Sequence, residues 1–145
     1  MKLVDIVESF SEVYISDYFE EEDIDMDDLA DQAEKIANTS SINILRDKEL
    51  MTVMINDKTG KVVGGLWTSF DGESYSFDVI VDSKYQNSGL GAKLIDSGMS
   101  QFNYYTDLDA KLDLHVTNPI LPKFLERKYG LKVTQKHPDG SVSMS

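Results

Sequence analysis

Residues 75–102 read YSFDVIVDSKYQNSGLGAKLIDSGMSQF, and they combine two different hydrophobic periods. The first seven residues are rich in β-branched and aromatic side chains and begin with the alternation of a half-buried strand. After a polar run from Asp82 to Ser88, apolar residues recur at helical spacing between Leu90 and Phe102. The stretch therefore predicts a strand that enters a helix through a glycine-containing turn.

The turn places two glycines, Gly89 and Gly91, at the predicted start of the helix. The first N–H groups of a helix have no intrahelical acceptor, and the helix dipole makes this end positive, so the turn could hold an anion. Glycine leaves the main chain open to a phosphate, but the spacing equally fits an ordinary tight turn with Ser88 as the N-cap. A Walker loop and a dinucleotide fingerprint are excluded because their further motif residues are absent.

Residues 81–94, VDSKYQNSGLGAKL, resemble the acyl-CoA-binding motif of the GCN5-related N-acetyltransferase (GNAT) superfamily, Gln/Arg-x-x-Gly-x-Gly/Ala after a strand that ends in valine. The resemblance extends over residues 50–144. It implies that amides of the turn bind the pyrophosphate of CoA and that the preceding strand pairs with the pantetheine arm. The cofactor-binding residues that it implies are Val79, Ile80, Val81, Gln86, Asn87, Ser88, Gly89, Leu90, Gly91, Ala92 and Asn118.

The fold class implied by the resemblance is α/β, a GNAT-like acyl-CoA N-acyltransferase fold with a mixed, mainly antiparallel sheet flanked by helices. The 145 residues suit a single domain, residues 1–145. Apolar spacing predicts two N-terminal helices before the sheet, one with a face between Leu3 and Tyr18 and one over Met26–Ala37. A chain that begins with a helix departs from the family, whose usual first strand would be missing, displaced or reduced.

The remaining predicted strands share alternating or β-branched sequences and lie at residues 42–45, 50–55, 62–70, 111–116, 131–134 and 141–144. Gly64-Gly65 inside one of them indicates a bulge or a close backbone approach. Strand 111–116 follows a helix, so we expect it to run parallel to strand 75–81. The resemblance implies that these two strands splay apart. A further helix is predicted between Pro119 and Gly130.

Three side chains are candidate catalytic residues. His115 aligns with a glutamate in a Leu-Glu-Val motif of the family's amino-terminal acetyltransferases, and an ordinary pKa of about 6.5 suits a general base, although it also fits the polar face of a half-exposed strand. Asp78 is a second candidate base, ahead of Ser76. The tyrosine with which the family protonates the leaving thiolate has no counterpart here, and Tyr129 is the nearest candidate acid. The resemblance assigns the oxyanion-binding N–H to Val81.

The amino-acid composition limits the classes of molecule that the protein is expected to bind. Net charge is −12, from 26 acidic and 14 basic residues, which argues against nucleic acid and would favour a cationic amine. The chain has no cysteine and only two histidines, well separated, so we expect neither a disulfide nor a metal site. No apolar run is long enough to cross a membrane and the N-terminus lacks signal-peptide features, so a cytoplasmic location is expected.

The resemblance implies an acetyltransferase that moves an acetyl group from acetyl-CoA, as co-substrate, to a primary amine. The acceptor could be a polyamine-like small molecule, a lysine side chain or a protein N-terminus. The alternative is a non-catalytic acyl-CoA-binding regulatory or interaction module, which the missing tyrosine keeps open. The sequence leaves the oligomeric state undecided, with a homodimer among the options.

Overall fold

The computed structural model describes residues 9–15, 25–39, 48–85, 89–106, 109–116 and 121–145. The helices are α1 (Met26–Thr39), α2 (Leu90–Thr106) and α3 (Leu121–Tyr129), with a short 3-10 turn at Ser83–Tyr85. The strands are β1 (Phe10–Tyr14), β2 (Glu49–Asn56), β3 (Val62–Phe70), β4 (Ser74–Val81), β5 (Lys111–Leu112), β6 (Leu114–Val116), β7 (Val133–Lys136) and β8 (Val142–Met144).

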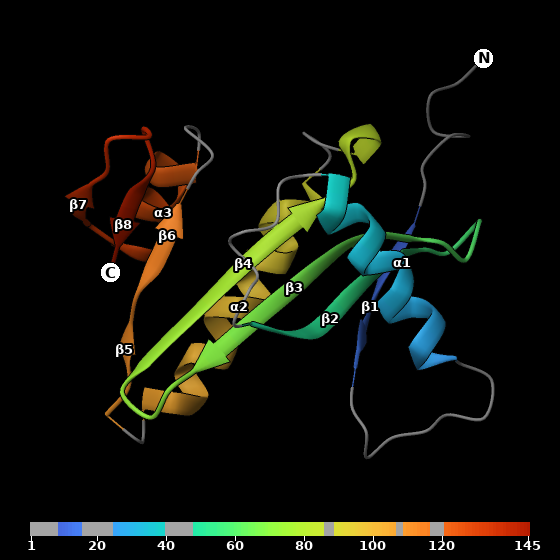
Figure 1. Cartoon of the computed structure of the whole chain (residues 1–145), viewed down its shortest axis with the longest axis horizontal. Helices are drawn as coiled ribbons and strands as arrows, with labels where there is room; N and C mark the ends of the chain where they lie inside the picture. The colour runs from blue at the N-terminus through green and yellow to red at the C-terminus, as the bar shows by residue number, and fades with distance from the viewer. Residues whose placement is uncertain (1–8, 16–24, 40–47, 86–88, 107–108, 117–120) are drawn as a thin grey trace.

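The strands form two sheets. The larger sheet has the order β1-β2-β3-β4-β5, and it is antiparallel except for the parallel pair β4 and β5. The smaller sheet has the order β6-β8-β7 and is antiparallel. Figure 1 shows the smaller sheet and α3 grouped beyond β4, on the side away from β3. A mixed, mainly antiparallel architecture is therefore confirmed.

Short turns fix the β2–β3–β4 meander. In the first turn the N–H of Gly60 donates to the carbonyl of Asn56, and Gly60 has a φ of 72°, which favours glycine. In the second turn the carboxylate of Asp71 accepts hydrogen bonds from the N–H groups of Glu73 and Ser74. The register between β2 and β3 shifts beside Gly64, which confirms the bulge predicted there.

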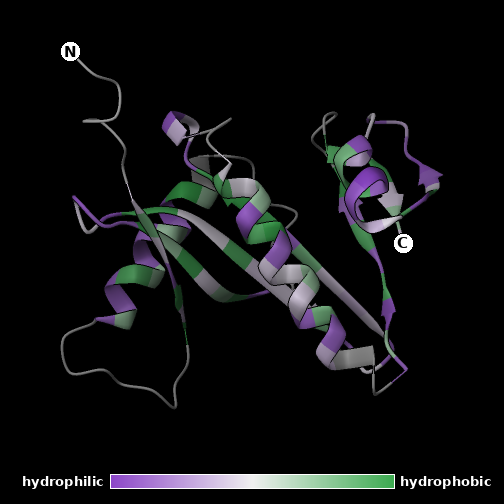
Figure 2. Cartoon of the chain, turned by 180° about the vertical axis from the view of Figure 1, so that it is seen from behind, coloured by the Kyte–Doolittle hydropathy of each residue, from purple (hydrophilic) through white to green (hydrophobic). Residues whose placement is uncertain are grey.

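Helices α1 and α2 cover opposite faces of the larger sheet, in front of and behind it in Figure 1. Seen from behind in Figure 2, hydrophobic and hydrophilic residues alternate along α2, as an amphipathic helix requires. On the α2 face Leu90, Leu94 and Ile95 pack with apolar residues of the sheet, including Leu66 and Phe77. The core on the α1 face is smaller and consists of Leu29, Ala33, Ala37, Val53, Val62 and Trp67.

The N-terminal prediction is partly wrong. Residues Phe10–Tyr14 do not belong to a helix. They form strand β1, which pairs antiparallel with β2. The second predicted helix is confirmed as α1, where the carboxylate of Asp25 accepts from the N–H of Asp28 at the helix start. One helix is therefore described before β2. The strand predicted at residues 42–45 lies outside the described residues.

Candidate functional site

Strands β4 and β5 separate soon after they pair. The parallel pairing covers only Ser74 with Lys111 and Tyr75 with Leu112, followed by a hydrogen bond of 2.9 Å from the N–H of Asp113 to the carbonyl of Tyr75. The next residues form β6, which pairs with β8 in the smaller sheet. Among the described residues, no strand pairs with this edge of β4 beyond Tyr75. The predicted parallel strand and its divergence from β4 are both present.

The register of β3 and β4 shows which main-chain groups face this open edge. The N–H of Asp82 donates to Val63, so residues in even positions of β4 direct their N–H and C=O toward β3. Residues in odd positions direct theirs the other way, as the carbonyl of Tyr75 does. Val79 and Val81 therefore present main-chain donors and acceptors to the gap. Ile80, also predicted to bind the cofactor, directs its main-chain groups toward β3.

A cavity of about 110 Å³ occupies the space between the diverging strands, and we call it the β4–β6 cavity. Its lining residues are Phe77, Asp78, Val79, Ile95, Leu114, His115, Val116, Leu121 and Leu125. Both predicted base candidates, Asp78 and His115, are therefore brought to one cavity although 37 positions separate them in the sequence. Most of the other lining residues are apolar, which strengthens electrostatic interactions inside.

Asp78 is a largely buried carboxylate. Its side chain is 14% exposed, and its Oδ2 lies 3.0 Å from the Nζ of Lys48, whose side chain is also 14% exposed. Burial raises the pKa of Asp78 to about 6, although the positive charges of Lys48 and His115 oppose that rise. The carboxylate is therefore ionised at neutral pH but is a stronger base than an exposed aspartate.

His115 lies on β6 with its ring exposed. Its neighbours Leu114 and Val116 pack in the core on the α2 face, so the alternation of the strand directs His115 to the opposite face, the side of Asp78. The ring stacks on that of His137 at a centroid distance of 5.1 Å. Nε2 of His137 lies 2.8 Å from Oγ of Ser143, which fixes the ring on which His115 stacks.

The start of α2 lies beside the end of β4. The first intrahelical bond runs from the N–H of Lys93 to the carbonyl of Gly89, so the N–H groups of Leu90, Gly91 and Ala92 have no intrahelical acceptor. Gly89 has a φ of 85°, which favours glycine. A Cβ on Gly91 would stand 3.9 Å from Cγ2 of Val81, so the helix start and the strand end are in close contact.

This arrangement fits an extended ligand with an anionic end. The open edge of β4 offers main-chain groups to an amide-bearing arm, and the positive helix end next to it suits a diphosphate. The predicted turn residues Gln86, Asn87 and Ser88, together with Asn118, lie outside the described residues. The described cofactor-binding candidates are therefore Val79, Ile80, Val81, Gly89, Leu90, Gly91 and Ala92.

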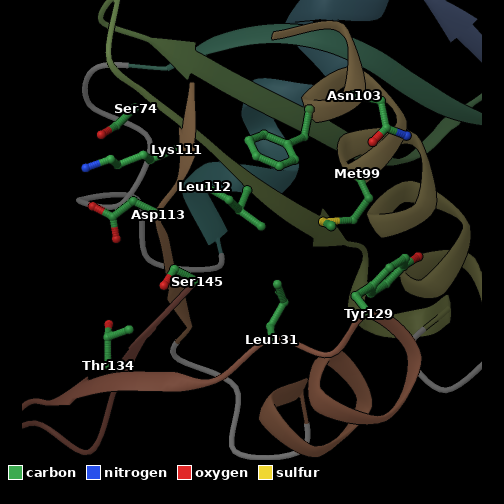
Figure 3. Close-up of a pocket in the computed structure, with 11 residues that line it drawn as sticks. Ser74, Met99, Asn103, Lys111, Leu112, Asp113, Tyr129, Leu131, Thr134 and Ser145 are labelled. Carbon is green, nitrogen blue, oxygen red and sulfur yellow. The ribbon is translucent and has the colours of Figure 1, made fainter. Parts of the chain in front are cut away.

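Tyr129, the candidate acid, lies outside the β4–β6 cavity. It lines a larger cavity of about 670 Å³ between the second half of α2, β5 and β7, where Figure 3 shows it near Met99 on the α2 side. Its hydroxyl is buried and has no hydrogen-bond partner among the described residues. Tyr129 is absent from the lining of the β4–β6 cavity, so the structure does not bring it together with Asp78 and His115.

Lys48 is the residue of this site that sequence analysis missed. It precedes β2 and follows a segment without a recognisable motif, so no local signal identifies it. The described residues contain no group of three or more histidine, aspartate or glutamate side chains placed to hold a metal ion. Within those same residues, no helix is long and apolar enough to cross a membrane.

The chain matches a known protein family and resembles solved structures. Residues 5–130 match the model of the acetyltransferase (GNAT) family. A search of curated protein sequences finds no match. Ard1 from Thermoplasma volcanium is similar in structure, with a TM-score of 0.60 and 18% identity over 93% of this chain and 95% of that one.

Two further solved structures are similar. The ribosomal-protein-S18-alanine N-acetyltransferase from Escherichia coli has a TM-score of 0.54 and 16% identity over 94% of this chain and 92% of that one. A GNAT family acetyltransferase from Elizabethkingia anophelis, solved with acetyl-CoA bound, has a TM-score of 0.53 and 17% identity over 93% and 94%. At these low identities the structural similarity shows only a shared fold. The match to the family model covers most of the sequence and shows the family. The chain belongs to the GNAT family of acetyltransferases.

Proposed function

We propose that this protein transfers an acetyl group from acetyl-CoA to a primary amine. The observation that supports this most directly is the open edge of β4 beside the first N–H groups of α2, which have no acceptor within the helix. Val79 and Val81 direct their main-chain groups into the gap, and the amides of Leu90 and Gly91 begin a helix next to Val81. A related acetyltransferase from Elizabethkingia anophelis was solved with acetyl-CoA bound, which supports the same ligand here.

The main chain would hold the co-substrate. The amides of Leu90, Gly91 and Ala92 suit the diphosphate, and Val81 suits the pantetheine arm. When bound, acetyl-CoA supplies the acetyl group as a thioester. Val79 lines the β4–β6 cavity beside Asp78, so we assign the oxyanion-binding N–H to Val79 in preference to Val81. An N–H already fixed in direction by a strand needs no reorganisation to stabilise the negative charge.

We assign the general base to His115. Its ring lies on the exposed side of the cavity, where an amine could approach it directly or through one water. Asp78 acts with it, because a nearby carboxylate stabilises the imidazolium that forms when the ring accepts a proton. The positive charge of His115 lowers the pKa of Asp78, which indicates that the two side chains are close enough to interact.

The acceptor would approach from the α1 face, toward which Asp78 and His115 are directed. The net charge of −12 would attract a cationic amine to the protein as a whole. Three acceptor classes fit: a polyamine-like molecule, a lysine side chain and a protein N-terminus. The similar structure from Escherichia coli is by its name an N-acetyltransferase of an alanine of ribosomal protein S18, which makes a peptide with an N-terminal alanine the first acceptor to test.

A non-catalytic acyl-CoA-binding module remains the alternative. The observation that favours it is that no tyrosine lines the β4–β6 cavity among the described residues, so no phenol is placed there to protonate the thiolate. Such a module would bind acetyl-CoA without releasing thiol, whichever amine is supplied.

Free thiol released from acetyl-CoA separates the two functions. The protein is incubated with acetyl-CoA and a panel of spermidine, a lysine peptide and peptides with different N-terminal residues, with isothermal titration of CoA alongside. Turnover on one class that His115→Ala abolishes supports the enzyme. Tight binding with no turnover on any amine supports the module, and an absence of CoA binding overturns both.

A further inference from the structure

Lys48 differs from the other lysines of the chain. Its side chain is 14% exposed and its Nζ lies 3.0 Å from Oδ2 of Asp78. Every other lysine among the described residues is exposed. A flexible side chain with a strongly hydrated ammonium group is normally found on the surface, so its placement against Asp78 is specific.

The amino group of Lys48 contacts a residue of the proposed acceptor site. Asp78 lines the β4–β6 cavity, and the next residue, Val79, lines it too and directs its N–H into the gap. His115, our proposed base, lines the same cavity. A primary amine is therefore held within hydrogen-bond distance of one member of the site and on the face from which the acceptor approaches.

We propose that Lys48 is a self-acetylation site, modified by the acetyl-CoA bound to its own chain. The inference rests on the proposed function, because it uses the same thioester and the same base. The acetyl acceptor in this reaction is supplied by the protein and needs no partner.

The reaction balances without a further reactant. The ammonium of Lys48 first loses a proton to the base and then attacks the thioester carbon with its lone pair. The C–N amide bond forms and the C–S bond breaks, and the sulfur leaves with the electron pair of that bond. The nitrogen gives up a second proton as the amide forms. One of the two protons completes the thiol of free CoA and the other passes to solvent.

Acetylation would change the site that carries it. The amide has no charge, so the ion pair with Asp78 is lost, and with it an interaction that lowers the pKa of that carboxyl. The neutral, longer side chain would also leave less room for an external amine. Self-acetylation would therefore reduce the activity on other acceptors.

The test uses the full chain, first stripped of existing acetyl groups with a deacetylase. It is then incubated with acetyl-CoA and no added amine, and the acetylated residues are mapped by mass spectrometry of peptides. We expect one acetyl group on Lys48, formed at a rate per molecule that does not change with protein concentration. Lys48→Arg should lose this mark. Lys58→Arg, the same change at an exposed turn residue, should keep it.

Gly91→Glu, which places a carboxylate where the diphosphate is expected, should slow the modification at least tenfold. An equal rate in Gly91→Glu, or equal acetylation of exposed lysines, would identify spontaneous chemical acetylation and overturn the inference. Acceleration with protein concentration would also overturn it, because one molecule would then modify another. Turnover on an added amine with Lys48 unmodified overturns the inference and leaves the proposed function intact, whereas failure of every amine together with an unmodified Lys48 removes both.

Discussion

The carboxylate of Asp78 and the ammonium of Lys48 form an ion pair of 3.0 Å in which each side chain is only 14% exposed. The pair joins the centre of β4 to the residue before β2, and the β2–β3 and β3–β4 turns lie between the two residues in the sequence. A buried pair gains from mutual attraction but loses the hydration of both charges. Because the pKa of Asp78 is raised in spite of Lys48, desolvation is the larger of the two effects at this carboxylate.

This balance makes stability depend on pH. The pKa of Asp78 is raised from 3.8 to about 6, so the folded protein binds this proton more tightly than the unfolded chain does. The stabilising contribution of the protonated form is present in acid and is lost as the pH rises from about 4 to about 6. Relative to Asp78→Asn, we expect the wild type to lose up to about 3 kcal/mol across that window.

Denaturant unfolding of both proteins at a series of pH values measures this difference, in which the titration of all other groups largely cancels. Asp113→Asn is the matched control, since it makes the same substitution at an exposed position. Parallel curves for the wild type and Asp78→Asn would show that Asp78 titrates alike in the folded and unfolded states.

Replacement of His115 by glutamine should lower kcat by about 10²–10⁴, which is the usual contribution of a general base. The KM for acetyl-CoA should change little, because the ring lies on the acceptor side of the gap. His137→Gln is the control: it removes the ring that stacks on His115 but leaves the base in place, so most activity should remain. Equal losses in the two variants would assign His115 a role in packing and not in proton transfer.

Protonation of Asp78 should also appear in catalysis. Below a pH of about 6 the carboxylate becomes neutral and no longer stabilises an imidazolium at His115, so kcat/KM should fall with an additional ionisation that belongs to Asp78. The pH profile of Asp78→Asn should show a single ionisation on this limb. A second ionisation that persists in Asp78→Asn would come from another group.

A charge at the start of α2 should weaken CoA binding without unfolding the protein. Among the described residues, a Cβ on Gly91 meets only Cγ2 of Val81, at 3.9 Å, so Gly91→Glu fits the space there, and an acid suits this end of a helix. Two like charges about 4 Å apart near a surface repel by about 4 kcal/mol, so the Kd for CoA should rise at least tenfold. Ser100→Glu adds the same charge to an exposed position of α2 and should leave the Kd unchanged in calorimetry.

The central fold elements could be predicted because their signals are local. The β2–β3–β4 meander and α2 each carry a clear hydrophobic period and glycine-containing turns, and all four are present. Strand β1 could not be predicted in this way. Phe10 packs in the core of the α2 face and Val13 in that of the α1 face, so the strand is apolar on both sides and lacks alternation. Pairing with β2, a tertiary interaction, determines its structure.

The parts of the candidate site also differ in whether a local sequence signal identifies them. The helix start and the strand before it are continuous in sequence, so one motif indicates both. Which of Val79, Ile80 and Val81 faces the gap depends on the register with β3, and only the structure provides that register. Lys48 lies 30 positions before Asp78, and no periodicity connects a residue in a loop to a partner on a distant strand.

The close packing of α2 on β4 depends on Gly98. A Cβ there would lie 2.7 to 2.8 Å from three ring atoms of Phe77, closer than such atoms can approach, and the Gly98 carbonyl accepts a hydrogen bond of 2.9 Å from the hydroxyl of Tyr75. Alanine normally stabilises a helix interior by about 1 kcal/mol relative to glycine, but overpacking a core costs about 1–3 kcal/mol.

We therefore expect Gly98→Ala to destabilise the protein by up to about 2 kcal/mol in denaturant unfolding. Gly91→Ala is the matched substitution on the same helix. Its added methyl group meets nothing closer than 3.9 Å in the part of the chain that the structure describes, so it should be neutral or stabilising. Because Phe77 lines the β4–β6 cavity, displacement of its ring in Gly98→Ala should also lower kcat. A stabilised Gly98→Ala would mean that α2 can move away from β4 at no cost, and that the helix start is not held rigidly against the strand.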